Sequence, residues 1–214
     1  MLPFLIGIGG KDSKPKCTRQ SIVAPKISVK RSIRLIVEEQ SISAVTNMKK
    51  LVIYNHGKDS MPWGEKTIGF AEVAKRYDFS FESPDYREQL DPDKRVKQLQ
   101  AMDLSGYDEV VLIGSSMGAY VVTVASELIK PKGLFLLAPA FYLPGYRHTE
   151  FKPTAEAIRV FHGWQDDIVP PENAWRFCQK YRVCLTLYDT DHRMLSVMPQ
   201  LIDEFSLFLA GLSG

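Results

Sequence analysis

The feature of this chain that most constrains its fold is a pentapeptide, Gly-Ser-Ser-Met-Gly, at residues 114–118. A β-branched apolar run at 110–113 precedes it, and a stretch typical of a helix at 119–128 follows it. The pattern Gly-x-Ser-x-Gly therefore falls on a sharp turn between a strand and a helix, which holds Ser116 under strain with its hydroxyl exposed. The flanking glycines are expected because a Cβ at either position would collide with the neighbouring strand or helix. The pentapeptide predicts a nucleophilic serine at the edge of a sheet.

A nucleophilic serine needs a base and an acid from elsewhere in the chain. The free hydroxyl is a weak nucleophile, so a histidine must take its proton and a carboxylate must hold that histidine in one tautomer. The histidines downstream of the pentapeptide are His148, His162 and His192. His162 begins the segment His-Gly-Trp-Gln-Asp-Asp-Ile-Val-Pro at 162–170, and His192 follows a strand-like run at 183–187. These two segments supply the candidate partners of the serine.

The segment at 162–170 resembles the H-G-x-x-D-x-x-V-P segment of the α/β-hydrolase superfamily, in which the acid follows the seventh strand of the sheet. The residue that matches this acid is Asp166, and His192 lies where the superfamily places its catalytic histidine. The order along the chain in that superfamily is Ser, Asp, His. The resemblance therefore implies a catalytic triad of Ser116, Asp166 and His192. It covers residues 48–214 and is similar to compact bacterial carboxylesterases, thioesterases and dienelactone hydrolases.

A second signature of the superfamily, the pair His56-Gly57, follows an apolar run at 51–55. Acyl transfer passes through a negatively charged tetrahedral intermediate, which backbone N–H groups stabilise. The resemblance implies that this oxyanion hole is formed by the N–H of Met117, directly after the nucleophile, and by the N–H of Lys58 or its neighbour. Taken alone, His56-Gly57 also fits an ordinary turn between a strand and a helix.

Each candidate of the triad has a rival or a structural alternative. Ser115 lacks the glycine spacing on both sides. Asp167 competes with Asp166, but neighbouring carboxylates diverge, so one of the two faces solvent or caps the helix expected near 170–171. Asp191 fits a loop residue that bonds local backbone. His162 fits a structural histidine at a strand end, and His148 is either an exposed loop residue or part of the pocket wall.

Strand-like and helix-like segments alternate along the rest of the chain. Such alternation predicts one α/β domain, a three-layer α/β/α sandwich around a mostly parallel, doubly wound sheet of about six strands. The expected strands are 51–55, 79–82, 110–113, 133–138, 158–161 and 183–187. The expected helices are 64–77, 92–104, 119–128, 171–181 and 194–209. This is a minimal form of the α/β-hydrolase fold.

The substrate pocket is less constrained by the sequence than the triad. The segment 139–148 is the candidate lid, and its aromatic residues Phe141, Tyr142 and Tyr146 either wall an acyl pocket or simply cover the strand ends. Trp63, beside the oxyanion loop, could join the same wall, and so could His56 and Gly57. So short a cap predicts an open site, suited to small acyl esters or to a long acyl chain in a surface groove.

Charge is unevenly distributed along the chain. The net charge is +2, but residues 1–47 carry +5 and the remaining residues carry −3. Residues 1–47 are therefore expected to be a basic N-terminal extension or to precede the authentic start at Met48, with 32–38 as a possible extra strand. Residues 48–214 are expected to form the catalytic domain. The apolar opening at 1–10 makes a poor signal peptide.

Several classes of function are disfavoured by composition and spacing. The chain has no run of 18 apolar residues, which predicts no membrane span, and no interleaved basic and aromatic stripe for nucleic acid. Cys17, Cys178 and Cys184 have no metal-type spacing and fit free thiols in a reducing cytoplasm. The expected partner is a small acyl ester or thioester, with no metal and no organic cofactor.

The expected activity is hydrolysis of carboxylic ester or thioester bonds through an acyl-serine intermediate. A serine nucleophile argues against dehalogenase and epoxide-hydrolase chemistry, for which members of the superfamily use an aspartate. Two alternatives remain: a binding module with an idle triad, and an acyltransferase or C–C hydrolase that uses the same three residues.

Overall fold

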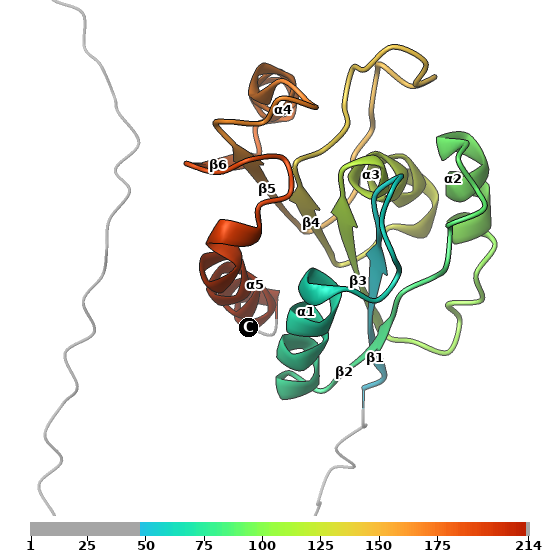
Figure 1. Cartoon of the computed structure of the whole chain (residues 1–214). Coiled ribbons are helices and arrows are strands. Elements are labelled where there is room, and N and C mark those ends of the chain that lie inside the picture. The colour runs from blue at the N-terminus through green and yellow to red at the C-terminus, as the bar shows by residue number, and fades with distance from the viewer. Residues whose placement is uncertain (1–47, 213–214) are drawn as a thin grey trace, which may run out of the picture. The chain divides into compact units, whose positions relative to one another are not determined.

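The computed structural model describes residues 48–212 of the chain (Figure 1). The expectations for residues 1–47, including the basic extension and the possible strand at 32–38, lie outside the described residues.

Residues 48–212 form a six-stranded sheet with helices on both faces. The strands are β1 (Lys50–Asn55), β2 (Phe79–Glu82), β3 (Glu109–Ser115), β4 (Gly133–Leu137), β5 (Ala157–Gly163) and β6 (Cys184–Tyr188). The helices are α1 (Glu65–Arg76), α2 (Pro92–Gln100), α3 (Met117–Ile129), α4 (Pro171–Tyr181), the 3₁₀ turn η1 (Leu195–Val197) and α5 (Met198–Leu212). The predicted three-layer α/β sandwich is confirmed.

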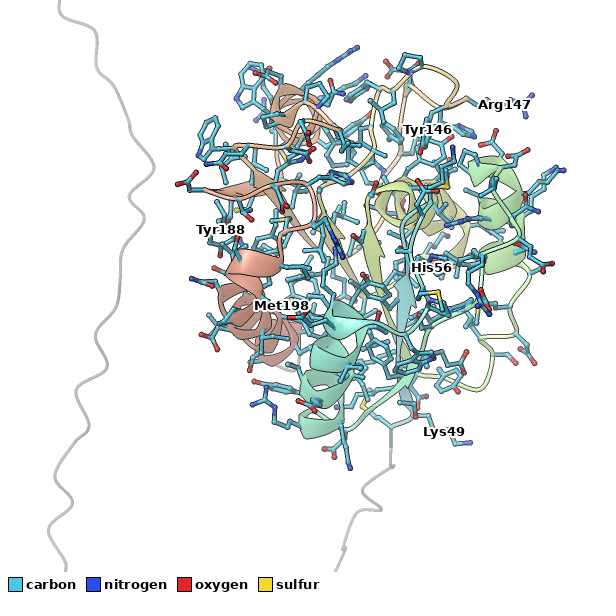
Figure 2. The ribbon with its side chains drawn as sticks, in the orientation of Figure 1. Lys49, His56, Tyr146, Arg147, Tyr188 and Met198 are labelled. Atoms are coloured by element: carbon cyan, nitrogen blue, oxygen red, sulfur yellow. The ribbon has the colours of Figure 1, made fainter. Side chains whose placement is uncertain are left out.

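The strand order is β2-β1-β3-β4-β5-β6, and every neighbouring pair is parallel. The chain moves from β1 outward to β2 and then returns to the other side of β1 to form β3, so the winding direction reverses between β1 and β3. In open α/β sheets, ligands bind at such a reversal, beyond the carboxyl ends of the strands. In Figure 2, Lys49 lies at the start of β1 and His56 at this carboxyl end.

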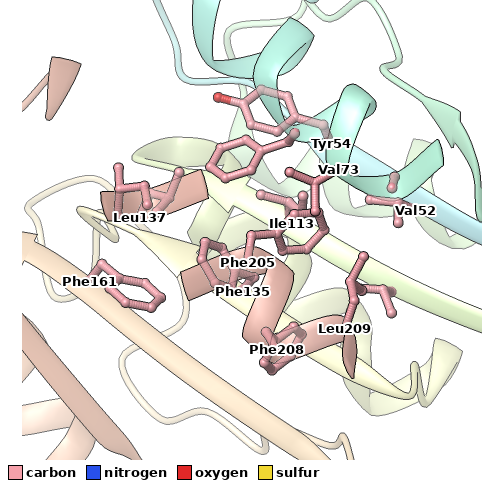
Figure 3. Packing of buried hydrophobic residues seen from close by; sticks show 14 of the residues in the cluster. Val52, Tyr54, Val73, Ile113, Phe135, Leu137, Phe161, Phe205, Phe208 and Leu209 are labelled. Atoms are coloured by element: carbon pink, nitrogen blue, oxygen red, sulfur yellow. The ribbon is translucent and has the colours of Figure 1, made fainter. Parts of the chain in front are cut away.

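The two faces of the sheet bury separate apolar clusters, because side chains alternate along each strand. In β1, Val52 and Tyr54 belong to the cluster under α1 and α5, whereas Leu51 and Ile53 belong to the cluster under α2, α3 and α4. Figure 3 shows the first cluster, where Phe205 packs edge-on against Phe135 with ring centroids 5.1 Å apart. Both layers hold the sheet rigidly beneath the loops at its carboxyl edge.

The C-terminal helical segment, Leu195–Leu212, is long and apolar enough to cross a membrane by length and composition, and no other helix in residues 48–212 is. Its residues Leu201, Phe205 and Leu209 have no exposed surface and belong to the cluster under α1 and α5. Burial against the sheet therefore accounts for its apolar composition, and the segment is a core helix of the fold.

Three predicted helix ends were wrong, and two of them have local reasons. The helix expected at 92–104 ends at Gln100, because Asp103 accepts hydrogen bonds from the N–H and O–H of Ser105 and favours a turn. The helix expected to start at Met194 starts at Met198, after the 3₁₀ turn, since Met194 has a left-handed φ of 56°. The last helix also continues to Leu212.

Candidate active site

Ser116 lies on the turn between β3 and α3, with φ 54° and ψ −117°. This is a strained conformation for a residue with a side chain. A Cβ on Gly114 would lie 2.4 Å from Ala119 Cα, and a Cβ on Gly118 would lie 1.8 Å from the carbonyl oxygen of Asn55. Both contacts are with backbone atoms that cannot move aside. The steric reason predicted for the two glycines is confirmed.

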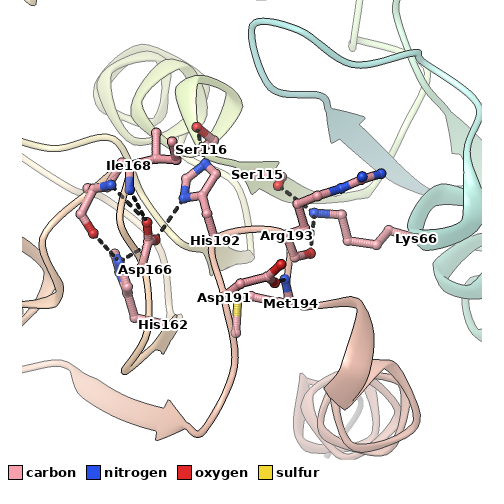
Figure 4. A network of polar contacts seen from close by, with 11 residues as sticks. Lys66, Ser115, Ser116, His162, Asp166, Ile168, Asp191, His192, Arg193 and Met194 are labelled. Atoms are coloured by element: carbon pink, nitrogen blue, oxygen red, sulfur yellow. Dashed lines mark hydrogen bonds and ion pairs between the residues drawn. The ribbon is translucent and has the colours of Figure 1, made fainter.

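The side chains of Ser116, His192 and Asp166 form one hydrogen-bonded series (Figure 4). His192 Nε2 lies 3.0 Å from Ser116 Oγ, and His192 Nδ1 lies 2.7 Å from Asp166 Oδ2. Because a carboxylate only accepts, Nδ1 carries the proton and the lone pair of Nε2 faces the serine. The three residues follow β3, β6 and β5, so the parallel sheet gathers them at one edge. The Ser116 hydroxyl therefore lies beside a base, His192, and the carboxylate of Asp166 holds that base in position.

Asp166 is a buried carboxylate with four donors. Its Oδ2 faces His192 and His162, and its Oδ1 accepts the N–H groups of Ile168 at 3.0 Å and Val169 at 2.8 Å. Burial alone would raise the pKa of Asp166, but the hydrogen bonds from His162, His192 and Val169 outweigh it and hold that pKa well below its usual range. Asp166 is therefore ionised under ordinary conditions.

The rival carboxylates lie elsewhere. Asp167 is exposed, and it takes part in no hydrogen bond or ion pair within residues 48–212. Asp191 accepts the N–H of Met194 at 3.0 Å, as expected for a loop residue. Of the candidate acids, Asp166 is the one that contacts His192.

His162 supports the acid from the opposite side. Its Nε2 lies 2.8 Å from Asp166 Oδ2 and 2.9 Å from the carbonyl oxygen of Val169. Both partners accept, so Nε2 carries the proton, and the buried Nδ1 has no partner within residues 48–212. Next to it, a Cβ on Gly163 would lie 2.3 Å from the carbonyl oxygen of Thr190, so the glycine lets the end of β5 approach the loop of His192. His162 is a structural histidine at the end of β5, which agrees with the structural alternative given for it above. Its hydrogen bond helps to hold the Asp166 carboxylate in place.

The loop after β1 lies against Ser116. A Cβ on Gly57 would be 3.5 Å from Ser116 Cβ, in ordinary van der Waals contact. The backbone N–H groups of Lys58 and Met117 donate no hydrogen bond to any residue in 48–212. Met117 is the first residue of α3, where helix N–H groups lack an internal acceptor and carry partial positive charge. Both N–H groups named by the sequence analysis are free to bind an anion.

His56 stabilises this loop from within the protein. It is 1% exposed; its Nε2 accepts the N–H of Tyr86 at 2.9 Å, and its Nδ1 donates to the carbonyl of Gly57 at 2.8 Å. Burial lowers the pKa of His56, which favours the neutral ring that this pairing requires. The suggestion that His56 lines the substrate pocket does not fit this burial.

The aromatic residues proposed for the pocket differ in exposure. Phe141 has no exposed surface and stacks on Phe177 at 4.3 Å, which fits the alternative that it covers the strand ends. The Tyr142 ring lies under the guanidinium of Arg176 at 4.1 Å, and Tyr146 lies in the outer loop that Figure 2 labels. Both tyrosines are partly buried.

Trp63 is half-exposed and follows β1, whereas those three residues follow β4. Its ring packs on Phe81 of β2, with centroids 5.7 Å apart. Together with Tyr86 and Met102 they line a cavity of about 510 Å³ whose wall contains no residue of the Ser116 series. Trp63 lines this cavity, whereas Phe141, Tyr142 and Tyr146 do not.

The segment that contains the candidate lid at 139–148 is irregular. Residues 138–156 connect β4 to β5 without any helix or strand (Figure 1). Within residues 48–212, no group of three or more His, Cys, Asp or Glu side chains is arranged to hold a metal ion.

Sequence reasoning missed two cationic side chains beside the site. Lys66 of α1 donates to Ser115 Oγ and to the carbonyl of Arg193, each at 3.1 Å (Figure 4). It thus joins the residue before Ser116 to the residue after His192. Arg95 of α2 is fully buried and donates to the loop after β1. Nothing in the local pattern distinguishes either residue from an ordinary helix cation.

No protein-family model matches the sequence, and no curated protein matches it either. Among solved structures, XCC1541 of Xanthomonas campestris pv. campestris, a candidate hydrolase of the alpha/beta superfamily, is similar with a TM-score of 0.68 and 27% identity over 76% of this chain and 99% of its own. Est1E of Butyrivibrio proteoclasticus with ferulic acid bound is similar with a TM-score of 0.62 and 16% identity, over 79% and 92%. The esterase Pf2001 of Pyrococcus furiosus gives 0.60 and 20%, over 78% and 85%.

Residues 48–212 have the fold of the α/β-hydrolase superfamily, and they are structurally similar to esterases of that superfamily. At the identities of Est1E and Pf2001, this likeness concerns the fold alone.

Proposed function

We propose that this chain is a serine hydrolase that cleaves carboxylic ester or thioester bonds through an acyl-serine intermediate. The observation that carries the proposal is the series of hydrogen bonds from Ser116 through His192 to Asp166, at 3.0 and 2.7 Å. The proton of the His192 ring is on the nitrogen that catalysis requires, because the unprotonated nitrogen faces the Ser116 hydroxyl. The unpaired N–H groups of Lys58 and Met117 beside the nucleophile support it further.

In the acylation step, His192 Nε2 takes the proton of the Ser116 hydroxyl as Ser116 Oγ attacks the carbonyl carbon of the substrate. The carbonyl oxygen becomes an oxyanion, and the N–H groups of Lys58 and Met117 stabilise it. His192 then gives its proton to the leaving oxygen or sulfur, and the bond between that atom and the acyl carbon breaks. The products are an alcohol or thiol and an ester of Ser116.

In the deacylation step, a water molecule attacks the acyl carbon while His192 Nε2 takes one of its protons. The second tetrahedral intermediate collapses when that proton passes to Ser116 Oγ, which releases the carboxylic acid. Asp166 remains ionised throughout and stabilises the protonated imidazole. Its four hydrogen bonds and its lowered pKa suit this role.

The proposed substrates are esters that can reach an open site. The short irregular segment at 138–156 supports this, because it offers little enclosure around the acyl group. Similarity to esterases favours oxygen esters as the first substrates to assay. The preferred length of the acyl chain is then determined by comparing the turnover of esters of different chain length.

The test of the nucleophile is turnover of p-nitrophenyl esters from acetate to palmitate. We expect the wild type to hydrolyse some of them and Ser116→Ala to lower kcat by about 10⁴-fold or more, because the acyl-enzyme cannot form. Ser105→Ala, at an exposed loop serine, is the matched control and should behave like the wild type. Equal rates in Ser116→Ala and wild type would exclude Ser116 as the nucleophile.

The same assay separates the two neighbouring acids. Asp166→Asn should lower kcat by roughly 10⁴-fold, because the amide favours the wrong tautomer of His192. Asp167→Asn makes the same chemical change at the exposed neighbour and should leave kcat within about twofold, as surface changes usually do. The reverse order of effects would assign the acid to Asp167.

Two other functions are compatible with the same residues. A binding module with an idle triad would not react with a serine-directed phosphonate, whereas an activated Ser116 should be labelled rapidly. An acyltransferase would form a new ester when an acceptor alcohol is added to the assay. Labelling followed by release of free acid alone supports hydrolysis.

A further inference from the structure

Arg95 is a buried cation that forms no ion pair within residues 48–212. The side chain, on α2, has no exposed surface, and no carboxylate of residues 48–212 lies within ion-pair distance of it. Its guanidinium donates only to backbone carbonyls. The acceptors are His56 at 3.0 Å and Gly57 at 3.2 Å from Nη1, Tyr86 at 3.0 Å from Nη2, and Gln89 at 2.5 Å from Nε. A buried charge is costly, so its placement among carbonyls of one loop needs a reason.

The carbonyl of Gly57 is the most heavily bonded of these acceptors. It also accepts from His56 Nδ1 at 2.8 Å and from Ser60 Oγ at 3.3 Å, in addition to Arg95 Nη1. Three donors on one oxygen leave its peptide unit little freedom to rotate. The loop that carries Gly57 is the loop that lies against Ser116.

The peptide unit that begins with the Gly57 carbonyl ends with the N–H of Lys58. A trans peptide is planar, and its C=O and N–H point in opposite directions. The donors on the Gly57 carbonyl therefore fix the direction in which the Lys58 N–H points. A cation on the oxygen side also draws electron density from the peptide and makes that N–H a stronger donor.

We propose that Arg95 is a positioning residue of the oxyanion hole: it holds the Gly57–Lys58 peptide so that the Lys58 N–H faces the reacting carbonyl oxygen. This inference rests on the proposed hydrolase function and adds a residue that never touches the substrate. It explains why a charged side chain is buried against the backbone carbonyls of this loop.

The test compares Arg95→Met, Arg95→Lys and the control Lys97→Met, which removes one exposed charge from the same helix. With p-nitrophenyl butyrate, both Arg95 variants should lose about 10-fold to 100-fold in kcat with little change in KM, since a misplaced donor weakens the transition state more than the ground state. Lysine keeps the charge but cannot bind the carbonyls of His56, Gly57 and Tyr86 together. Lys97→Met should match the wild type.

A second readout excludes a merely structural role. Phenylboronic acid forms a tetrahedral anion on a reactive serine, whereas benzoic acid stays trigonal. The Arg95 variants should bind phenylboronic acid more weakly in proportion to their loss of kcat, with unchanged affinity for benzoic acid. If Arg95→Met does not fold, Arg95→Lys and the rescue of Arg95→Ala by millimolar guanidinium carry the same comparison.

Folded Arg95 variants that keep the wild-type kcat and boronate affinity would overturn the inference while leaving the hydrolase function intact. A wild type that hydrolyses no ester and is not labelled by a phosphonate would overturn the proposed function, and the inference with it.

Discussion

Charged side chains at this site are stabilised by backbone groups more than by opposite charges. Asp166 accepts two backbone N–H groups besides two histidines, and Arg95 donates to four backbone carbonyls. Hydrogen bonds to ionised groups are stronger than neutral ones, which offsets part of the cost of burial. Each of these charges therefore also fixes the backbone of a loop at the site.

Lys66 is a third charge of this kind, but it is held by fewer partners. Burial, together with the nearby charge of Arg193, lowers the pKa of Lys66 from 10.5 to about 8. The unfolded chain then binds more protons than the folded protein between these values. The free energy of unfolding contributed by this group therefore rises with pH from about 8 to about 10.5.

We expect Lys66→Met to flatten this rise. The measurement is urea unfolding of both proteins at several values between about pH 7.5 and 9.5, with Lys75→Met, at an exposed lysine of the same helix, as control. Taking the difference between variant and wild type removes the titration of Cys178, whose pKa burial raises to about 12 in both. A difference that does not change with pH would contradict the lowered pKa.

At the scale of elements, the site depends on how closely α3 approaches β1. Gly118, the second residue of α3, passes over the end of β1 so closely that any side chain would meet the carbonyl of Asn55. The N-terminus of α3 is thereby brought against the loop that carries Gly57 and Lys58. The N–H of Met117, the first residue of α3, donates no hydrogen bond within residues 48–212.

We therefore expect Gly118→Ala to destabilise the protein by several kcal/mol and to abolish ester turnover, because the new Cβ would lie 1.8 Å from Asn55 O. Gly211→Ala is the matched control in α5, where nothing lies within 4 Å of a new Cβ. It should leave stability unchanged or raise it by up to about 1 kcal/mol, since alanine favours helix. Thermal unfolding measures both, and a stable Gly118→Ala would contradict the close approach of α3 to β1.

At the scale of the whole molecule, one property of the sheet assembles the site. All six strands are parallel, so the loops after β1, β3, β5 and β6 meet at one edge. The reversal of winding between β1 and β3 separates the helices there, and Ser116 at this position is partly exposed. Both apolar clusters and all of these loops lie within residues 48–212.

A chain that begins at Met48 is therefore expected to fold and to hydrolyse p-nitrophenyl esters with the kcat and KM of the full chain. Circular dichroism and the ester assay on both forms test this, with Ser116→Ala in the shorter form as the blank. Loss of folding or activity in the shorter form would show that residues 1–47 contribute to the domain.

The features that could be predicted from the sequence are those that depend on neighbours along the chain. The strained turn at Ser116 and its glycines follow from local sterics, and the strands and helices follow from apolar periodicity. The proximity of Ser116, Asp166 and His192 was predicted from their order along the chain and from the resemblance to the α/β-hydrolase superfamily. The predictions were least accurate at the ends of helices. At Met194, for example, the left-handed backbone conformation and not the apolar periodicity sets the boundary of the helix.

Local patterns in the sequence were enough to predict the fold class and the residues that meet at one edge of the sheet. The contacts of Arg95, Lys66 and His162 and the burial of Phe141 are visible only in the three-dimensional structure. Arg95 reaches a carbonyl 39 residues away, and Lys66 a hydroxyl 49 residues away. Such contacts cannot be predicted locally, because a hydrogen bond depends on distance in space, which a pattern of neighbouring residues does not encode.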